Sequence, residues 1–202
     1  MQKRVPFHPS DQPGPNKIPP MVRSLCAALL LASAAAAAQT ESAPYVGQPG
    51  KDVVWVPTPY TLVEKMLDMA RVTPKDYVID LGSGDGRNVI AAAKRGASAL
   101  GVEYDRQLLE IARKNAADAG VAKKARFVHG DMFEADISKA TVLALFLLPD
   151  NLRKLKPKFE KLRSGTRIVT NGFEIDGWEP RSVEKIDKDC GGWCTAYLYV
   201  VK

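Results

Sequence analysis

Cysteine, histidine and aromatic residues are all scarce in this chain of 202 residues. It contains three cysteines and two histidines, and 7% of its residues are aromatic. After residue 38 the chain has a single histidine, His129, so it lacks the ligands for the four-coordinate site that is typical of structural zinc. We therefore predict no metal site.

Excess basic charge is also missing from most of the chain. The formal net charge is +6, but residues 1–38 hold four basic side chains and one acidic one. The remaining residues carry 25 basic and 22 acidic side chains. A domain with so small an excess has no electrostatic need for a polyanion, so nucleic acid is not an expected partner.

No apolar run is long enough to span a bilayer. The longest, Leu25–Ala38, has 14 residues, whereas a transmembrane helix needs about 18 or more. It follows a short basic opening that includes Arg23 and ends in three alanines before Gln39, which is typical of a cleaved secretory leader. We predict a signal peptide over 21–38, no membrane span after its cleavage, and a periplasmic or secreted protein. An uncleaved anchor or a buried Ala-rich helix is the alternative, and the protein is cytoplasmic if the leader is not functional.

The segments on either side of this leader have little pattern. Residues 1–20 contain six of the 14 prolines and form either an extension or a start assigned too early, with Met21 the true first residue. Residues 39–53 are polar and punctuated by Gly and Pro, and we predict a flexible arm there. Residues 54–202 are then the folded domain.

The two cysteines of the exported chain lie close together, at Cys190 and Cys194. In an oxidising compartment they can form a small disulfide loop, and the glycines between them let the backbone adapt. Two free thiols are the alternative.

Apolar runs alternate with amphipathic stretches through the domain. Thr58 and Pro59 are placed to begin a helix that reaches Ala70, while Pro157 is expected to break the helix predicted over 150–163. Predicted strands alternate with predicted helices, and the last two strands form a hairpin. This order predicts an α/β fold, a doubly wound parallel sheet with an antiparallel edge. The other helices are expected at 87–95 and 105–120, and the strands at 77–81, 99–103, 126–128, 141–148, 166–170, 183–186 and 196–201.

A glycine-rich loop follows the first predicted strand and carries the strongest functional signal. Glycines at alternate positions let the backbone approach a ligand, and the next helix begins at once. The spacing differs from the dinucleotide pattern, because Arg87 occupies the place of its third glycine. The acidic Asp80 would repel a pyrophosphate but can bind a cationic amino-acid group. The predicted ligand contacts here are Asp80, Gly82, Ser83, Gly84 and Gly86.

Two further acidic residues follow the next strands. Glu103 is placed to accept hydrogen bonds from ribose hydroxyls. Asp131 can accept from an adenine amine, and Met132 can contact the ring. Each residue also has a structural interpretation, as a turn former or a helix cap. Together, a cationic amino-acid site, a ribose site and an adenine site predict S-adenosylmethionine as the cofactor.

These motifs resemble those of class I, seven-strand methyltransferases: VIDLGSGDGR at 78–87, GVE at 101–103 and GD at 130–131. WVPTP at 55–59, LFLLP at 145–149, LKP at 155–157 and GTRIV at 165–169 followed by GW at 177–178 resemble a compact group that includes archaeal and mitochondrial protein-lysine methyltransferases. The resemblance implies one domain with the strand order 3-2-1-4-5-7-6. It also implies that the segment around Thr58 folds over the cofactor.

The leading hypothesis is an S-adenosylmethionine-dependent methyltransferase that acts on an amine, with protein lysine suggested as the acceptor. A non-catalytic exported module that binds the same nucleoside is the alternative, and Arg87 disfavours a nicotinamide oxidoreductase. No residue is predicted as a catalytic base. By position alone, Phe146, Leu147 and Asn171 are candidates for the acceptor pocket. Residues 146–150 lack the Asn/Asp-Pro-Pro-aromatic signature of adenine N-methyltransferases, which argues against a DNA-adenine substrate.

Overall fold

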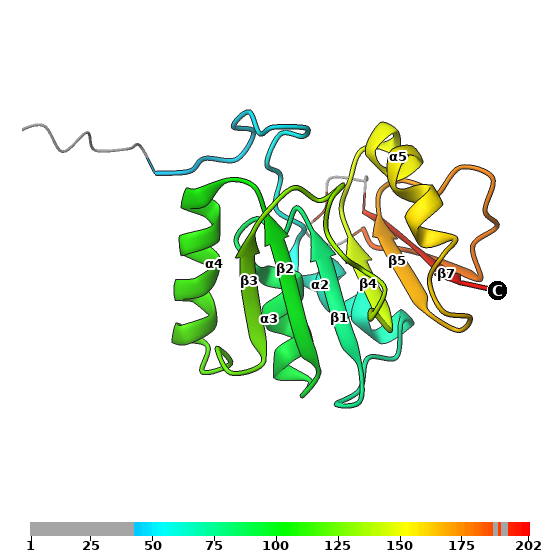
Figure 1. The fold of residues 1–202 in the computed structure, drawn as a ribbon, viewed down its shortest axis with the longest axis horizontal. Helices are drawn as coiled ribbons and strands as arrows, with labels where there is room; N and C mark the ends of the chain where they lie inside the picture. The colour runs from blue at the N-terminus through cyan, green and yellow to red at the C-terminus, as the bar shows by residue number, and fades with distance from the viewer. Residues whose placement is uncertain (1–42, 188–189, 191–193) are drawn as a thin grey trace, which may run out of the picture. The chain divides into compact units, whose positions relative to one another are not determined.

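A seven-stranded sheet forms the centre of the molecule, in the order β3-β2-β1-β4-β5-β7-β6 (Figure 1). Strands β1 to β5 run parallel, and β7 is antiparallel to both β5 and β6. This topology confirms the predicted doubly wound sheet with its antiparallel strand. The strands are β1 Tyr77–Leu81, β2 Ser98–Glu103, β3 Ala125–His129, β4 Val142–Leu145, β5 Arg167–Asn171, β6 Ser182–Lys185 and β7 Thr195–Val200.

The structure is a computed structural model that describes residues 43–187, 190 and 194–202. Residues 43–202 form one compact unit. The segments predicted as an extension (1–20) and a leader (21–38) lie outside the described residues. Within the described ranges, no helix is both long and apolar enough to cross a membrane.

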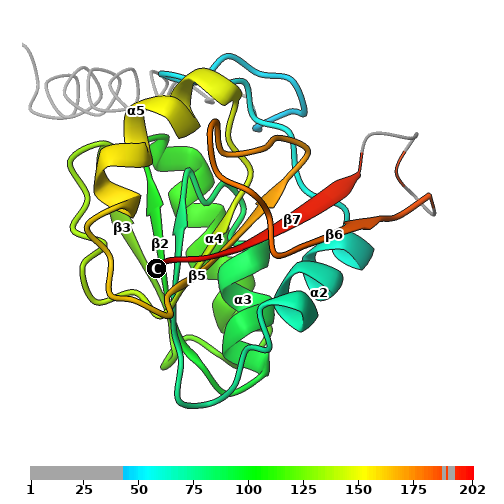
Figure 2. The same cartoon turned by 90° about the vertical axis from the view of Figure 1, so that its right-hand side faces the viewer.

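Helices cover both faces of the sheet (Figure 2). Helices α2, α3 and α4 pack on one face around a core that includes Leu62 and Val89. Helix α5 packs on the other face, where Leu155 and Phe159 join the second core. The helices are α2 Tyr60–Met69, α3 Arg87–Lys94, α4 Arg106–Asp118 and α5 Pro149–Phe159.

Strands β1 and β4 are buried almost throughout, as expected for central parallel strands that are covered on both faces. In contrast, every residue of edge strand β6 is exposed, and two of its four residues are charged, which discourages pairing with another chain. The strand order reverses between β1 and β4. Ligands of open α/β sheets bind at the carboxyl ends of the strands beside such a reversal.

The ends of three helices test the sequence predictions. Asp105, the first residue of the helix predicted over 105–120, caps α4, because its carboxylate accepts hydrogen bonds from the backbone N–H groups of residues 107 and 108. Helix α2 begins one residue later than predicted, with Pro59 at the cap position, and the Thr58 hydroxyl accepts a hydrogen bond from Asn171 instead. Helix α5 continues through Pro157 to Phe159. Since Pro157 lies so close to the helix end, its missing N–H costs one hydrogen bond and does not break the helix.

Candidate functional site

A cleft lies at the carboxyl ends of β1, β2 and β4, beside the strand-order reversal. Its empty volume, including the part open to solvent, is about 880 Å³. In Figure 1 the first described residues of the chain, in blue, run past the ends toward which the β1 and β2 arrows point. The predicted site residues that line this cleft are Thr58, Asp80, Gly82, Ser83, Gly84, Glu103, Asp131 and Met132.

The glycine loop between β1 and α3 lies close against its neighbours. Gly84 has a φ of +54°, and a Cβ at this position would lie 2.6 Å from the indole nitrogen of Trp55. Gly86 is not among the residues that line the cleft. A Cβ there would lie 2.6 Å from the Phe127 ring, so this glycine lets α3 begin close to the sheet. Gly86 thus has a packing role in the structure, and its predicted contact with the ligand stays a prediction.

Ser83 reaches the cleft from the same loop. Its side chain is buried, and its Oγ has no hydrogen-bond partner within the described part of the chain. A Cβ at Gly101 on β2 would lie 2.5 Å from this Oγ, so the glycine leaves room for the serine. A buried hydroxyl without a partner beside an open cleft is available to a bound ligand.

Glu103, at the end of β2, joins the loop to the helix that follows. One carboxylate oxygen accepts the Gly84 N–H at 2.7 Å, and the other accepts the Asp105 N–H at 2.9 Å. A carboxylate oxygen has a second lone pair, so both oxygens can still accept from a ligand hydroxyl. The structure therefore places Glu103 where a ribose diol can bind it.

Asp80 lies deeper in the cleft and is 3% exposed. Burial raises the pKa of its carboxyl well above the usual value; a hydrogen bond from Asn88 at 3.1 Å opposes this shift, and the charges of Glu103 and Asp85 add to it. A cationic group bound at Asp80 would stabilise the ionised carboxylate. The buried Asp80 carboxyl is therefore suited to bind an ammonium group.

Asp131, which the sequence predicts to contact the adenine, already has two hydrogen-bond partners within the protein. One oxygen accepts the Phe133 N–H at 2.9 Å, and the other lies 2.5 Å from the Lys51 ammonium. The hydrogen bond from Lys51 is the main cause of the lowered pKa of Asp131. Lys51 also lies 5.0 Å from the centre of the Tyr104 ring. Met132, which is 7% exposed, supplies an apolar wall at the same place.

Residues 43–53, within the predicted flexible arm, are held over the cleft. The backbone N–H of Gly47 donates to the Trp55 carbonyl at 2.8 Å, and the Trp55 N–H donates to the Gln48 carbonyl at 3.0 Å. The Gln48 side chain donates to Asp105 at 3.1 Å. Sequence reasoning missed Gln48, Lys51 and Asp105 as residues of the cleft, because their partners are 57 and 80 residues apart in the sequence.

Arg87 is neutralised by its neighbours. Two of its nitrogens bind the Asp85 carboxylate at 2.5 and 2.9 Å, and a third donates to the Thr58 carbonyl at 2.5 Å. Its guanidinium also lies 4.8 Å from the centre of the Tyr60 ring. Arg87 therefore ties the start of α2 to the glycine loop.

Acidic side chains outnumber basic ones around the cleft, six against two. Both basic residues, Lys51 and Arg87, are paired with acidic ones, so the lining keeps a net negative charge. Such a lining fits a cationic nucleoside and disfavours a pyrophosphate. Together with the buried Asp80 and the Ser83 hydroxyl, which has no partner among the described residues, it fits S-adenosylmethionine. The acidic residues are Asp52, Asp80, Asp85, Glu103, Asp105 and Asp131.

The three candidates for the acceptor pocket have different places. Phe146 lines the cleft, whereas Leu147 is 1% exposed and belongs to the core. Asn171 is fully buried at the end of β5; its amide nitrogen donates to the Thr58 hydroxyl at 3.4 Å, and its oxygen has no partner among the described residues. His129 is exposed beside the Tyr104 ring, 5.6 Å between centroids, and does not line the cleft.

Cys190 and Cys194 form a disulfide, as predicted for an oxidising compartment. Both residues lie between β6 and β7, where the Ile186 N–H donates to the Cys194 carbonyl at 2.9 Å. The structure holds no cluster of three or more potential metal ligands within residues 43–187, 190 and 194–202.

Known proteins resemble this chain in both sequence and structure. A family model described as the ANTKMT methyltransferase domain matches residues 80–182. A protein-lysine N-methyltransferase of Saccharolobus islandicus is 46% identical over 152 residues, which cover 74% of this chain and 94% of that protein. The adenine nucleotide translocase lysine N-methyltransferase of Mus musculus is 32% identical over 142 residues, and the match covers 69% of this chain but only 57% of the mouse protein.

Among solved structures, an RNA methyltransferase from Salinibacter ruber in complex with S-adenosyl-L-homocysteine has a TM-score of 0.68 and 44% sequence identity. The match covers 72% of this chain and 94% of that one. The ligand in that structure is the demethylated form of the nucleoside that the cleft of this chain fits.

Proposed function

The chain belongs to the ANTKMT methyltransferase family, and we propose that its methyl acceptor is the side-chain amine of a protein lysine. It is a methyltransferase, and S-adenosylmethionine is its methyl donor. The observation that carries the lysine proposal is the acidic cleft, six carboxylates against two paired basic groups, which attracts a cationic acceptor. The names of the Saccharolobus islandicus and Mus musculus relatives support the same acceptor.

Three carboxylates have separate roles in this proposal. Asp80 holds the ammonium group of the donor, Glu103 holds its ribose hydroxyls, and Asp131 accepts from its adenine amine. The bound donor supplies a methyl group on a positively charged sulfur. The chain contributes orientation and exclusion of water, since segment 43–58 covers the cleft and Trp55 lies against the glycine loop.

The transfer itself is a displacement in which the lysine must be a free amine. The lone pair of its nitrogen forms a bond to the methyl carbon, and the bond from that carbon to sulfur breaks. Sulfur keeps the electron pair as a neutral thioether, and the proton that the ammonium form carried passes to water. Removal from water and the positive charge on the donor sulfur both lower the pKa of a lysine amine at the point of transfer and so favour the reactive form.

RNA is the competing acceptor, because the Salinibacter ruber neighbour is an RNA methyltransferase. A phosphate backbone approaching this cleft would meet an excess of carboxylates, whereas Lys51 and Arg87 are already bound to Asp131 and Asp85. Proteins that bind nucleic acid present Lys and Arg groups to the phosphates. The described cleft therefore favours a protein acceptor.

A methyl-transfer experiment tests this proposal. The purified protein and isotopically labelled S-adenosylmethionine are incubated with fractionated envelope proteins, soluble proteins and total RNA, and labelled products are mapped by mass spectrometry. We expect label on lysine side chains. Label on RNA alone, or on protein residues other than lysine, would overturn the lysine acceptor. Tight donor binding without transfer to any fraction would favour the non-catalytic module instead.

We propose further that the protein is exported. The predicted leader at 21–38 and the Cys190–Cys194 disulfide support an oxidising compartment. N-terminal mass analysis of the protein recovered from cell fractions tests this location. A mature chain that begins at Gln39 outside the cytoplasm is expected. An intact segment 1–38 on protein found only in the cytoplasm would contradict export.

A further inference from the structure

A second hollow lies beside the donor cleft and has a different chemistry. Its empty volume, including the part open to solvent, is about 570 Å³. Its described lining consists of Val56, Phe146, Gly172 and Phe173. Val56 and Phe146 also line the donor cleft, so the two spaces share a wall.

The fold brings this lining together from three segments. Phe146 follows β4, and Gly172 follows β5. The two strands are parallel neighbours with Leu145 opposite Thr170, so the residues after them meet at the carboxyl edge of the sheet. Val56 comes from the segment that covers the cleft. The hollow thus lies beside the donor cleft on its β4–β5 side, away from Glu103 and the ribose position.

The chemistry of the two spaces is complementary to the two parts of a lysine side chain. The described walls of the hollow are one aliphatic side chain, two aromatic rings and a glycine, with no charged group among these residues. The donor cleft beyond the shared wall carries the carboxylates. A lysine has a flexible aliphatic stem that packs on apolar surface and a cationic tip that is attracted to aromatic faces and carboxylates.

We infer that this hollow is the passage through which the acceptor lysine reaches the donor, with Phe173 as its outer wall and Val56 and Phe146 as its inner opening. This inference rests on the proposed lysine acceptor. Because the passage is apolar, the lysine stem is desolvated along it and the amine meets the donor away from bulk water. Phe146 and Val56 then determine which acceptors react, since a bulkier side chain does not fit the passage and a shorter one does not reach the donor.

A charge placed at Phe173 tests the passage without touching the donor cleft, because Phe173 lines the hollow and not the cleft. The probe is a synthetic peptide that spans the lysine methylated in the mapping experiment. Phe173→Lys is expected to weaken peptide binding to the S-adenosylhomocysteine-loaded protein, and to lower kcat/KM, by about tenfold or more, since like charges repel in a poorly solvated site. Donor affinity, measured by calorimetry, should stay within about twofold.

Phe173→Leu is the matched control, because it keeps an apolar wall and should change peptide binding by less than about threefold. Val183→Lys, on exposed strand β6, introduces the same charge outside the hollow and should leave peptide binding unchanged. A Phe173→Lys protein that binds and methylates the peptide as the wild type does would overturn the inference.

The length of the acceptor gives a second test on the wild-type protein. Replacing the peptide lysine by ornithine removes one methylene, so the amine stops short of the donor and transfer should fall about tenfold or more. Equal transfer to both peptides would overturn a passage of defined depth. If the wild type methylates RNA and not lysine, the proposed function fails. If it methylates lysine and Phe173→Lys has no effect, the passage alone is wrong.

Discussion

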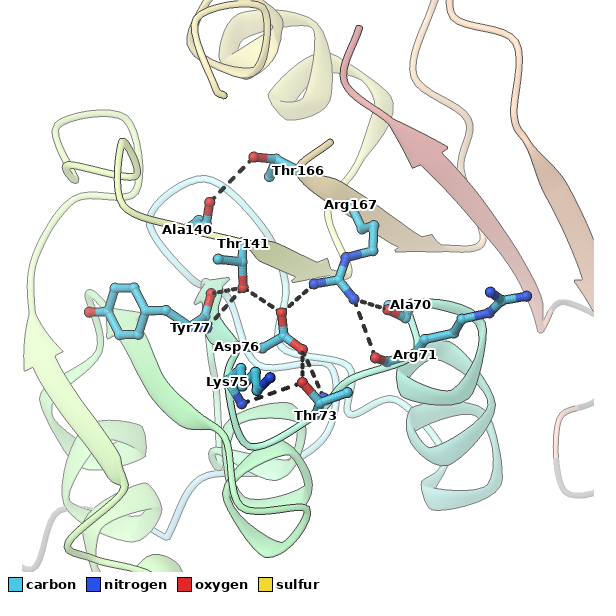
Figure 3. Close-up of polar contacts among 10 residues, drawn as sticks. All are labelled: Ala70, Arg71, Thr73, Lys75, Asp76, Tyr77, Ala140, Thr141, Thr166 and Arg167. Carbon is cyan, nitrogen blue, oxygen red and sulfur yellow. Dashed lines mark hydrogen bonds and ion pairs between the residues drawn. The ribbon is translucent and has the colours of Figure 1, made fainter. Parts of the chain in front are cut away.

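The two carboxylates Asp76 and Asp80 lie at opposite ends of strand β1 and have opposite surroundings. Asp76 comes just before the strand, at the end away from the cleft. Figure 3 shows its carboxylate among Thr73, Thr141 and Arg167. Burial alone would raise the pKa of its carboxyl, but hydrogen bonds from Thr73, Thr141 and Arg167 outweigh this and lower it. Asp80 is buried in the cleft with one hydrogen bond, from Asn88, and its pKa is raised well above the usual value.

The difference follows from what each carboxylate is paired with. Arg167 binds Asp76 and also donates to the carbonyls of Ala70 and Arg71, so one guanidinium joins the end of α2 to β1 and β5 (Figure 3). Asp76 therefore has its full set of partners within the protein. Asp80 has a deficit of partners, and this deficit is what a cationic ligand can fill. One end of β1 stabilises the fold, and the other is held ready for binding.

Removing Asp76 should have the largest effect on stability. Asp76→Ala leaves the partly buried Arg167 guanidinium without its carboxylate, and we expect the free energy of unfolding to fall by about 3 kcal/mol. Denaturant unfolding measures this change. Asp118→Ala removes an exposed partner of Lys114 and should cost less than about 0.5 kcal/mol. Equal unfolding midpoints for Asp76→Ala and the wild type would contradict the structural role.

Neutralising Asp80 should stabilise the free protein and weaken donor binding. Asp80→Asn removes a buried charge but keeps the shape, so we expect the free protein to become more stable by about 1 kcal/mol. Donor affinity should fall by about a hundredfold, because the ammonium group of the donor loses its carboxylate. Calorimetry and denaturant unfolding measure the two effects. Asp136→Asn is the control, since this carboxylate lies outside the cleft. A donor affinity within twofold of the wild type would remove Asp80 from the binding site.

At acid pH the stability of both variants should approach that of the wild type, with Asp76→Ala rising toward it and Asp80→Asn falling toward it. The folded-state pKa of Asp76 lies below its unfolded value of about 3.9, so its stabilising contribution is present above that pH and is lost as the pH falls through the folded value. The folded-state pKa of Asp80 is raised, so its contribution is present below about pH 4 and is lost as the pH rises through the folded value.

We therefore expect Asp76→Ala to be less stable than the wild type at pH 7, and Asp80→Asn to be more stable. Both differences should shrink toward pH 3. Thermal or denaturant unfolding across this range measures them. A stability difference for Asp80→Asn that stays constant with pH would contradict the raised pKa.

The smallest effect concerns the segment over the cleft. Lys51 binds one carboxylate oxygen of Asp131, the residue assigned to the adenine amine, so Lys51→Met should strengthen donor binding by about threefold. Lys65→Met, which removes an exposed partner of Glu184, is the matched control. Calorimetry with S-adenosylhomocysteine measures both. Weaker binding by Lys51→Met would show that Lys51 contributes more by holding the segment closed than it costs by occupying Asp131.

Local patterns predicted most of the sheet and the cleft lining from β1 to β3. A buried apolar run, glycines at alternate positions and an immediate helix specify the β1–α3 turn, and Glu103 and Asp131 follow neighbouring strands in the same way. The pattern did not predict that Gly86 packs on Phe127. It gave too much weight to Pro157, which α5 accommodates near its end.

Contacts between distant segments could not be predicted. Residues 43–53 have no periodicity, and yet Lys51 meets Asp131 and Gln48 meets Asp105. The Asp76–Arg167 pair joins residues 91 apart in the sequence, and nothing local in either segment marks the other as its partner. Such pairs depend on the order of the strands and on the path of residues 43–53 over the cleft. Neither can be located residue by residue from local sequence patterns.

By itself, the sequence determined the alternating elements, the glycine turn and the carboxylates at successive strand ends, because these depend on residues close together in the chain. Only the tertiary structure decided which end of β1 is satisfied and which is left open. It also decided that Val56 and Phe146 stand between an acidic cleft and an apolar hollow. The reason is physical: burial, charge pairing and the shape of a passage are properties of side chains that meet in space, and the chain brings them together only after the sheet has formed.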